Sequence, residues 1–243
     1  MSYLSWRIAA AVSVALTLSA GAPAAVDPGV ASPPRLEFTP PAPGSYALQR
    51  IQPVRDAVLL DPSGRATHLA AVTTAKITLL TFFYTYCADP LGCPFAYRTL
   101  SEVRRVIRAD AALAPRVRFA SVSLDPGTDT PEAIGRYRDM VAGSSTPEWQ
   151  VLTAASVRQL LPVLEDFGQD VSIERAADGS ARRTVHHMLK MFLIDAGGEV
   201  REIYTLAYLQ PAVIANDIRT LYLEEIAAVR VRVSGAPIRS ARR

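Results

Sequence analysis

Cysteine and histidine are scarce in this sequence, whose 243 residues contain two cysteines and three histidines. The two cysteines, Cys87 and Cys93, lie in one short segment. Any thiol chemistry therefore has to involve this pair, and the same two thiols could hold a soft metal. The chain also has no internal repeat, and its length suits one domain with extensions.

Clusters of basic charge are missing from most of the chain. The formal net charge is +3, and lysines and arginines are spread along the sequence, which excludes the basic patch typical of a nucleic-acid-binding protein. The exception is the C-terminus, where several arginines but no acidic residues follow Glu225. We predict that residues 227–243 form a basic, poorly ordered tail, and we prefer this to a patch that binds a membrane or a partner.

The N-terminal apolar stretch, Ile8–Leu18, is shorter than the roughly 20 residues that a membrane-spanning helix needs. It follows the basic Arg7 and precedes the small-residue site Ala22-Pro23-Ala24, which is the pattern of a secretory signal. We predict that residues 1–25 are a signal peptide or, if uncleaved, a membrane anchor. Export would place the cysteines in an oxidising compartment.

Residues 26–45 are rich in proline, alanine and glycine, which predicts an extended linker. Strand and helix patterns alternate through residues 46–226, and Asp178-Gly179 indicates a hairpin turn. We therefore predict an α/β fold with a central mixed β-sheet flanked by helices and an inserted β-hairpin. Strands are expected near residues 58–65, 77–84, 117–124, 149–152, 191–195 and 199–204, and helices near residues 94–109, 131–141, 155–167 and 211–226.

The cysteines follow a strand that is apolar on both faces. Ile77–Tyr84 leads into Cys87, and Pro94 fits the first turn of a helix that starts beside Cys93. A helix N-terminus stabilises a thiolate through its dipole and free N–H groups. The pair therefore suits redox chemistry or soft-metal binding. A structural disulfide is the simplest alternative, but closing so short a loop gains little chain-entropy stabilisation.

A metal would need a third ligand, and the histidines are His68, His186 and His187. His68 lies in a polar connection, and we expect it to be an ordinary surface residue. His186 and His187 precede the strand near residues 191–195, on the side of the fold where they would face the cysteines. Because adjacent residues of an extended segment point in opposite directions, we expect at most one of the two to reach the thiols.

Three motifs occur in a fixed order, and together they resemble the signatures of the Sco/SenC family, the copper chaperones of cytochrome c oxidase assembly. The match extends from about residue 48 to about residue 225. The motifs are Thr81-Phe82-Phe83-Tyr84-Thr85-Tyr86-Cys87 with Cys93-Pro94, then Asp125-Pro126 with Asp129-Thr130-Pro131-Glu132, then Val185-x-His187 eight residues before Asp195.

The resemblance implies a thioredoxin-like domain in which Cys87, Cys93 and His187 bind one copper ion, as Cu(I), Cu(II) or both. The distance to Asp195 selects His187 over His186, and Asp125 is implied as an acid that supports the site. The chain departs from the family in one respect. Five residues separate the cysteines instead of the usual three, so we expect Cys87 in the loop and Cys93 at the helix start, with residues 89–92 bulging out.

We therefore expect a periplasmic copper-binding assembly factor that delivers copper to a respiratory oxidase or a similar cuproprotein. The partner would be a cuproprotein such as an oxidase copper subunit, and the N-terminal segment would leave the protein soluble or tethered to the inner membrane. We expect a metallochaperone rather than an enzyme. The alternative is a thiol–disulfide oxidoreductase that uses Cys87 and Cys93 as catalytic residues to reduce the copper-site cysteines of a partner, without requiring His187.

Overall fold

The computed structural model describes residues 36–141, 146–174 and 184–233. The predicted signal or anchor at residues 1–25, the first part of the predicted linker and the hairpin turn at Asp178-Gly179 lie outside these ranges. No helix within the described part of the chain combines the length and apolarity needed to cross a membrane.

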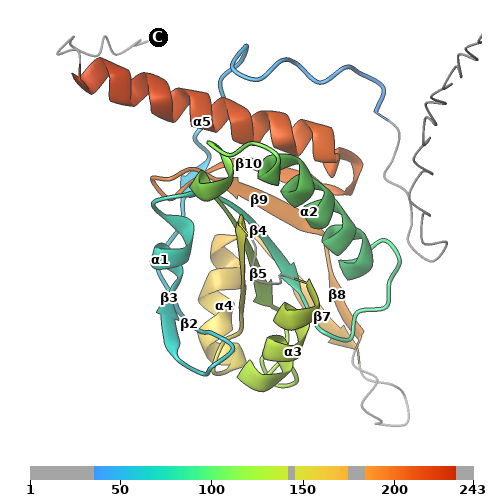
Figure 1. The fold of residues 1–243 in the computed structure, drawn as a ribbon. Coiled ribbons are helices and arrows are strands. Elements are labelled where there is room, and N and C mark those ends of the chain that lie inside the picture. Colours follow the sequence, from blue (N-terminus) through green and yellow to red (C-terminus); the bar gives the residue numbers. More distant parts are fainter. Residues whose placement is uncertain (1–35, 142–145, 175–183, 234–243) are drawn as a thin grey trace, which may run out of the picture.

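The expected α/β architecture with a central mixed sheet is confirmed. In the described residues the main sheet has six strands in the order β1-β10-β9-β4-β5-β6 (Figure 1). Its centre is the parallel pair β4 and β5, in which every residue is buried. The strands are β1 (Gln52–Pro53), β4 (Ile77–Phe83), β5 (Val117–Ser123), β6 (Glu148–Leu152), β9 (Lys190–Ile194) and β10 (Glu199–Thr205).

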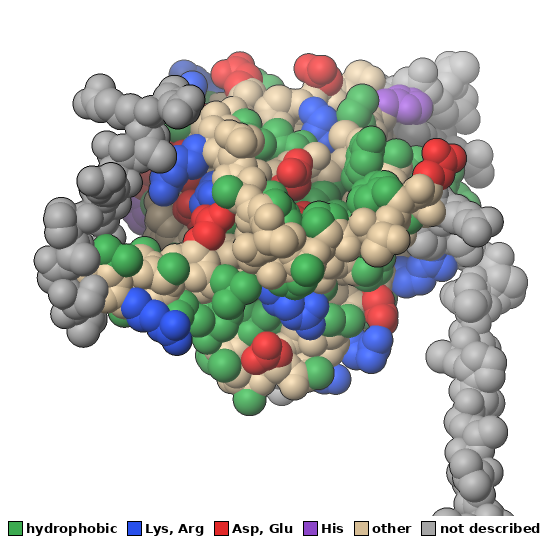
Figure 2. All heavy atoms as spheres, turned by 90° about the horizontal axis from the view of Figure 1, so that it is seen from above, with side chains coloured by type: hydrophobic (Ala, Val, Ile, Leu, Met, Phe, Trp, Pro, Cys, Tyr) green, Lys and Arg blue, Asp and Glu red, His purple; other side chains and the backbone are tan. Residues whose placement is uncertain are grey.

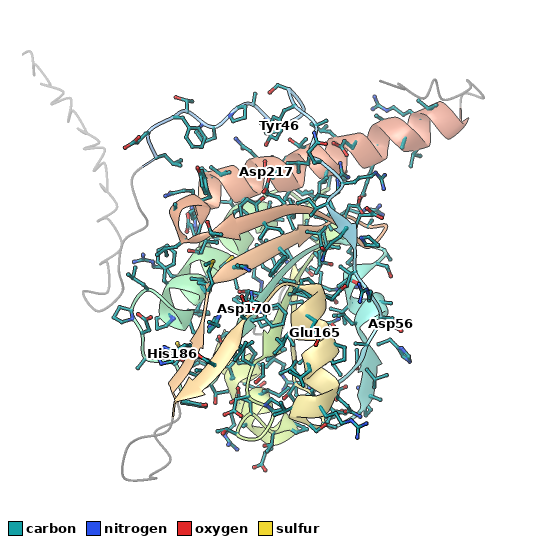
Figure 3. All side chains as sticks on the ribbon, turned by 180° about the vertical axis from the view of Figure 1, so that it is seen from behind. Tyr46, Asp56, Glu165, Asp170, His186 and Asp217 are labelled. Atoms are coloured by element: carbon teal, nitrogen blue, oxygen red, sulfur yellow. The ribbon has the colours of Figure 1, made fainter. Side chains whose placement is uncertain are left out.

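Helices cover both faces of this sheet. α2 (Cys93–Arg108) and α4 (Val157–Asp166) lie on opposite faces, as the front and back views show (Figures 1 and 3). α5 (Pro211–Val233) packs against α2 and β4. The remaining helices are α1 (Leu69–Thr73), α3 (Pro131–Val141) and the short 3-10 turns η1 (Ala114–Arg116) and η2 (Leu206–Tyr208).

Two small ladders stand outside the main sheet. β2 (Val58–Leu60) pairs with β3 (Ala66–His68) around the expected turn, and β7 (Val171–Glu174) pairs antiparallel with β8 (Thr184–His187). The second ladder confirms the inserted hairpin. Its register places His186 opposite Ser172 and His187 opposite Val171.

Two boundaries differ from the sequence-based expectation. The last helix, expected to end at Ile226, extends to Val233 and takes in the first residues of the predicted basic tail. Ala227, Ala228 and Arg230 are strong helix formers, and arginines near a helix C-terminus interact favourably with its dipole.

At the second boundary, the end of the predicted linker, the chain contacts α5, which the sequence did not predict. The Gly44 N–H donates to Thr220 Oγ1 at 3.0 Å, and the Asn216 side chain donates to the Pro41 carbonyl at 3.0 Å. The composition predicted that this segment is extended, but it could not predict its hydrogen bonds to Thr220 and Asn216 of α5, some 170 residues later in the sequence.

The topology brings the ends of the central strands together. Because β4 and β5 are parallel, the loops that follow Phe83 and Ser123 leave the sheet at the same edge. The first loop carries Cys87, and the second carries Asp125 and Asp129.

The surface of the domain is mixed in character. On the face that carries α5, basic and acidic side chains are interspersed with apolar ones (Figure 2).

Candidate metal and thiol site

The loop after β4 is held by a buried carboxylate. Asp129 is fully buried and accepts hydrogen bonds from the Thr85 hydroxyl at 2.5 Å and from the Ser123 hydroxyl at 2.6 Å. The Tyr86 hydroxyl donates to Asp125 at 2.7 Å. Both aspartates of the second sequence motif therefore connect the end of β5 to the segment that carries Cys87. Asp125 lies near the site, as the resemblance implied, and it acts through Tyr86.

Cys93 is the first residue of α2, and Cys87 lies in the loop before it, as the wide spacing predicted. Both are free thiols. The Cys93 N–H donates to Cys87 Sγ at 3.4 Å, so the helix N-terminus points at the first thiol. A Cβ atom placed on Gly92 would lie 3.1 Å from Cys87 Sγ. Glycine at this position therefore permits the close approach of the two cysteines.

The extra residues between the cysteines form a tight turn. The Asp89 side chain accepts from the Leu91 N–H at 3.0 Å, and the Asp89 carbonyl accepts from the Gly92 N–H at 2.9 Å. These bonds are typical of a turn built by aspartate on its own backbone. The bulge expected at residues 89–92 is thus an ordered turn that brings the chain back to Cys93.

The two thiols have very different acidities. The hydrogen bond from the Cys93 thiol, aided by the Tyr84 hydroxyl and the Cys93 N–H, lowers the pKa of Cys87 to about 5 despite partial burial. The same thiol–thiol bond, together with burial, raises the pKa of Cys93. Burial and the bond to Cys87 raise the pKa of Tyr84. Cys87 is therefore a thiolate at neutral pH, whereas Cys93 and Tyr84 remain protonated donors.

His187 stands at the end of β8, close to Tyr84. The ring centroids of these two residues are 6.2 Å apart in an edge-to-face arrangement. Burial lowers the pKa of His187, so its imidazole is neutral at pH 7. His187 Nδ1 lies 3.2 Å from the Met188 carbonyl, which can only accept a hydrogen bond. The proton is therefore on Nδ1, and Nε2 carries the lone pair that a metal needs.

One cavity of about 680 Å³ joins these residues. Its lining includes Tyr84, Cys87 and residues 185–190. Both His186 and His187 line it, but His187 is half-buried beside Tyr84 whereas His186 is exposed on the hairpin (Figure 3). His68 lies elsewhere, exposed and hydrogen-bonded to Asp56 at 2.7 Å, as expected for a surface histidine.

The predicted ligands share this region without forming a closed metal site. Cys87 and Cys93 are in direct contact, and Cys87 and His187 face the same cavity. Within the described ranges, however, no three histidine, cysteine, aspartate or glutamate side chains lie close enough together to hold a metal ion. Binding by Cys87, Cys93 and His187 would therefore require the histidine to approach the thiols.

Sequence reasoning missed two residues of this site. Tyr84 was assigned to the strand and to the first motif, and Asp129 to the second motif, but neither was given a role at the site. Tyr84 hydrogen-bonds to Cys87, and Asp129 anchors the cysteine loop. The position of Tyr84, three residues before Cys87 at the end of a buried strand, could have identified it. A buried tyrosine hydroxyl requires a hydrogen-bond partner, and the Cys87 thiol is a candidate partner nearby in the sequence.

Comparison with known proteins gives a consistent result. A family model described as SCO1/SenC matches residues 55–223. No curated protein matches the chain. The structure is similar to copper-bound ScoI from Bradyrhizobium japonicum, with 25% identity, a TM-score of 0.56, and coverage of 68% of this chain and 96% of ScoI.

Two further solved structures share the fold. Apo Sco1 from Thermus thermophilus is 24% identical with a TM-score of 0.60, and the match covers 73% of this chain and 95% of Sco1. BsSco, which contains a disulfide switch and is a member of the Sco family of cytochrome c oxidase assembly proteins, is 21% identical with a TM-score of 0.54. That match covers 71% of this chain and 94% of BsSco.

Proposed function

Because the chain belongs to the SCO1/SenC family, we propose that it is an exported copper-binding assembly factor that delivers copper to a respiratory oxidase or a similar cuproprotein. Copper bound to ScoI from Bradyrhizobium japonicum and the description of BsSco as a cytochrome c oxidase assembly protein support this proposal. Residues 1–25 would direct the protein to the periplasm or tether it to the inner membrane.

The observation that carries the proposal is that Cys87 and His187 line one cavity. Cys93 contacts Cys87 through the hydrogen bond from its N–H to Cys87 Sγ. Two sulfurs and one imidazole nitrogen form a donor set that suits copper. Cys87 is ionised and His187 is neutral at pH 7, so both have a lone pair available. Copper is the cargo of this site, and Cys87, Cys93 and His187 are its proposed ligands.

Movement of the hairpin would complete the site. β8 pairs only with β7 among the described strands, so His187 is carried by a two-stranded ladder outside the main sheet. Such a ladder can shift without breaking the hydrogen bonds of β4. Closure would bring the imidazole to the thiols, and opening would let groups of the recipient protein replace the ligands one at a time.

Metal titration of the reduced full-length chain tests this function. We expect the double variant Cys87→Ser/Cys93→Ser to lose copper binding and His187→Ala to bind copper more weakly, because each removes part of the donor set. His68→Ala is the matched control, since His68 is exposed and remote from the cavity. Copper binding that is unchanged in both site variants would refute the proposal.

The asymmetry of the thiols favours a second candidate function. A Cys87 thiolate beside a protonated, buried Cys93 is the arrangement of an attacking and a resolving cysteine. Cys87 would attack the disulfide of a partner, and Cys93 would then displace the partner from the mixed disulfide. The chain would end with a Cys87–Cys93 disulfide, and the partner with two thiols.

His187 distinguishes the two functions, because reduction does not need an imidazole ligand. The discriminating measurement combines the reduction potential of the pair with disulfide reduction by wild type and His187→Ala in the absence of copper. Strong reductase activity that survives this substitution would favour the oxidoreductase. Weaker copper binding by His187→Ala, together with negligible reductase activity of the wild type, would favour the copper carrier.

A further inference from the structure

Met188 occupies an unusual position beside the proposed copper ligand. It lies in the two-residue connection between β8 and β9, immediately after His187, and it lines the same cavity as Cys87. The residue is 61% exposed. Its carbonyl accepts the hydrogen bond from His187 Nδ1. One residue therefore orients the imidazole through its backbone and also belongs to the lining of the cavity.

Met188 is much more exposed than the nearby methionine of β9. Met191, three residues later, is fully buried in β9, where burial of its apolar side chain stabilises the fold. Single exposed apolar residues are common and need no explanation by themselves. Met188 differs from them because it lines the same cavity as a cysteine and a histidine.

The chemistry of a thioether restricts the ions that it can bind. Sulfur ligands of this kind select Cu(I), whereas carboxylates and water favour harder ions. The cavity also contains Asp89 and Asp170, which would suit Cu(II). The Asp89 carboxylate, however, already accepts the Leu91 N–H in the intercysteine turn. The methionine side chain is unbranched and has three rotatable bonds, so it can adjust its reach across the cavity.

We infer that Met188 is an additional thioether ligand and that the cargo of the site is Cu(I). Met188 takes up the ion at the exposed side of the cavity and shares it with Cys87, Cys93 and His187 by ligand exchange, in which copper keeps its oxidation state. This inference deepens the proposed copper function and depends on it, because a thioether alone on a protein surface would hold copper only weakly.

The first experiment measures Cu(I) affinity by anaerobic competition with a chromogenic chelator, using the reduced full-length chain. Met188→Leu keeps the size and apolar character of the side chain but removes the sulfur. We expect it to lower the affinity for Cu(I) about tenfold, in the range measured when one supporting contact of a metal site is lost. The ratio of Cu(I) to Cu(II) affinity should fall as well. Met140→Leu is the matched control, because Met140 is 71% exposed on α3, outside the cavity.

The second experiment follows the sulfur directly. Anaerobic NMR of the methionine methyl groups should show that Cu(I) shifts the methyl signal of Met188 and leaves that of Met140 unchanged. Equal Cu(I) affinity in wild type and Met188→Leu, with an unshifted Met188 signal, would overturn the role of Met188 while leaving the copper function intact. A wild-type chain that binds neither Cu(I) nor Cu(II) would instead overturn the proposed function itself.

Discussion

At the residue scale, Tyr84 connects the end of the central strand to the thiol chemistry. Its hydroxyl hydrogen-bonds to Cys87, and its ring contacts His187. Tyr84 therefore contacts the thiol through its hydroxyl and the imidazole through its ring. A variant without the hydroxyl would lose the contact to Cys87 and keep the contact to His187.

We expect Tyr84→Phe to raise the pKa of Cys87 by about one unit, because a hydrogen bond to a charged group contributes about 1.5–3 kcal/mol and one pKa unit corresponds to about 1.4 kcal/mol. The pKa of Cys87 is measured from the rate of its alkylation by iodoacetamide as a function of pH. The midpoint of this pH profile, near pH 5 in wild type, should move to higher pH in Tyr84→Phe. The exposed Tyr208→Phe serves as the control, and an unshifted midpoint in Tyr84→Phe would exclude the hydroxyl as a cause.

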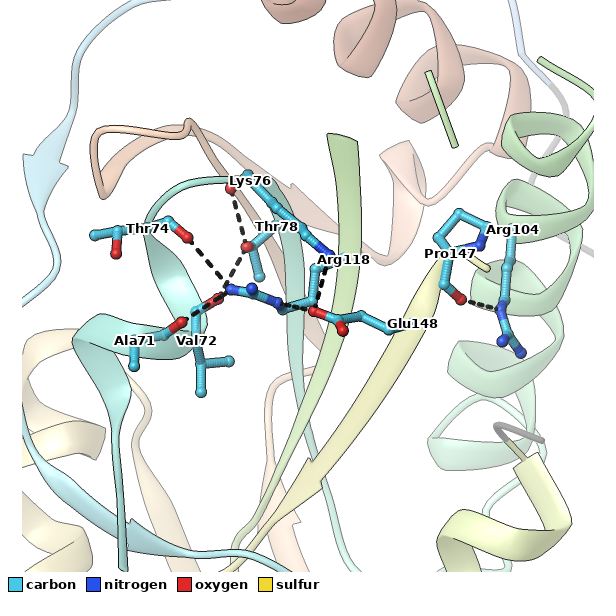
Figure 4. A network of polar contacts seen from close by, with 9 residues as sticks. All are labelled: Ala71, Val72, Thr74, Lys76, Thr78, Arg104, Arg118, Pro147 and Glu148. Carbon is cyan, nitrogen blue, oxygen red and sulfur yellow. Dashed lines mark hydrogen bonds and ion pairs between the residues drawn. The ribbon is translucent and has the colours of Figure 1, made fainter. Parts of the chain in front are cut away.

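At the scale of elements, Arg118 joins α1 to the central sheet. This buried arginine of β5 donates from Nη1 to the carbonyls of Ala71, Val72 and Thr74 at the end of α1, and from Nε to Glu148 of β6 (Figure 4). The planar guanidinium can serve several acceptors at once, which a lysine ammonium on a flexible stem does less well. Helix C-terminal carbonyls otherwise lack partners within the helix.

We expect Arg118→Lys to lower the free energy of unfolding by about 2 kcal/mol, because at least one buried carbonyl loses its donor. The midpoint of urea unfolding measures the loss. Arg136→Lys provides the comparison, since Arg136 forms an exposed ion pair with Glu132 on α3 that contributes at most about 1 kcal/mol. Equal midpoints for the two variants would contradict a supporting role for Arg118.

At the scale of the whole molecule, residues 41–46, which precede β1, are hydrogen-bonded to α5 and are called the N-terminal strap below. Tyr46 and Tyr204 both donate to the Asp217 carboxylate (Figure 3 shows Tyr46 and Asp217). Gly44, with a φ of +76°, turns the chain where an added Cβ would meet Leu223 at 2.8 Å. The position of the strap determines where the chain that leads back to residues 1–25 leaves the domain.

The strap predicts a pH dependence. Burial and the bond to Asp217 raise the pKa of Tyr46 to about 12 from its ordinary value of 10.0. Between these values the unfolded state has lost the phenol proton and the folded state has kept it, so stability falls as the pH rises from 10 to 12. Urea unfolding at several alkaline pH values should show a shallower decline for Tyr46→Phe than for wild type. The half-buried Tyr222→Phe on α5 should keep the wild-type slope, and identical slopes in all three proteins would contradict the assignment.

Local patterns predicted most of the fold, because burial periodicity and turn chemistry are properties of neighbouring residues. The central strands, the hairpin and the start of α2 at the cysteines all follow from such patterns. The docking of the strap did not, since it depends on contacts between segments that are distant in the sequence. Local composition does not encode those contacts.

The order of the residues alone shows that two thiols stand where a buried strand meets a helix, and three motifs in a fixed order identified the family. Which thiol is ionised follows from the folded arrangement, because the donors to Cys87 are Cys93, Tyr84 and the N-terminus of α2 acting together. The fold also brings His187 and Met188 to the cavity that Cys87 lines, although they lie about 100 residues away along the chain. The folded sheet brings these segments side by side, and acidity and metal binding depend on distances in space rather than on spacing in sequence.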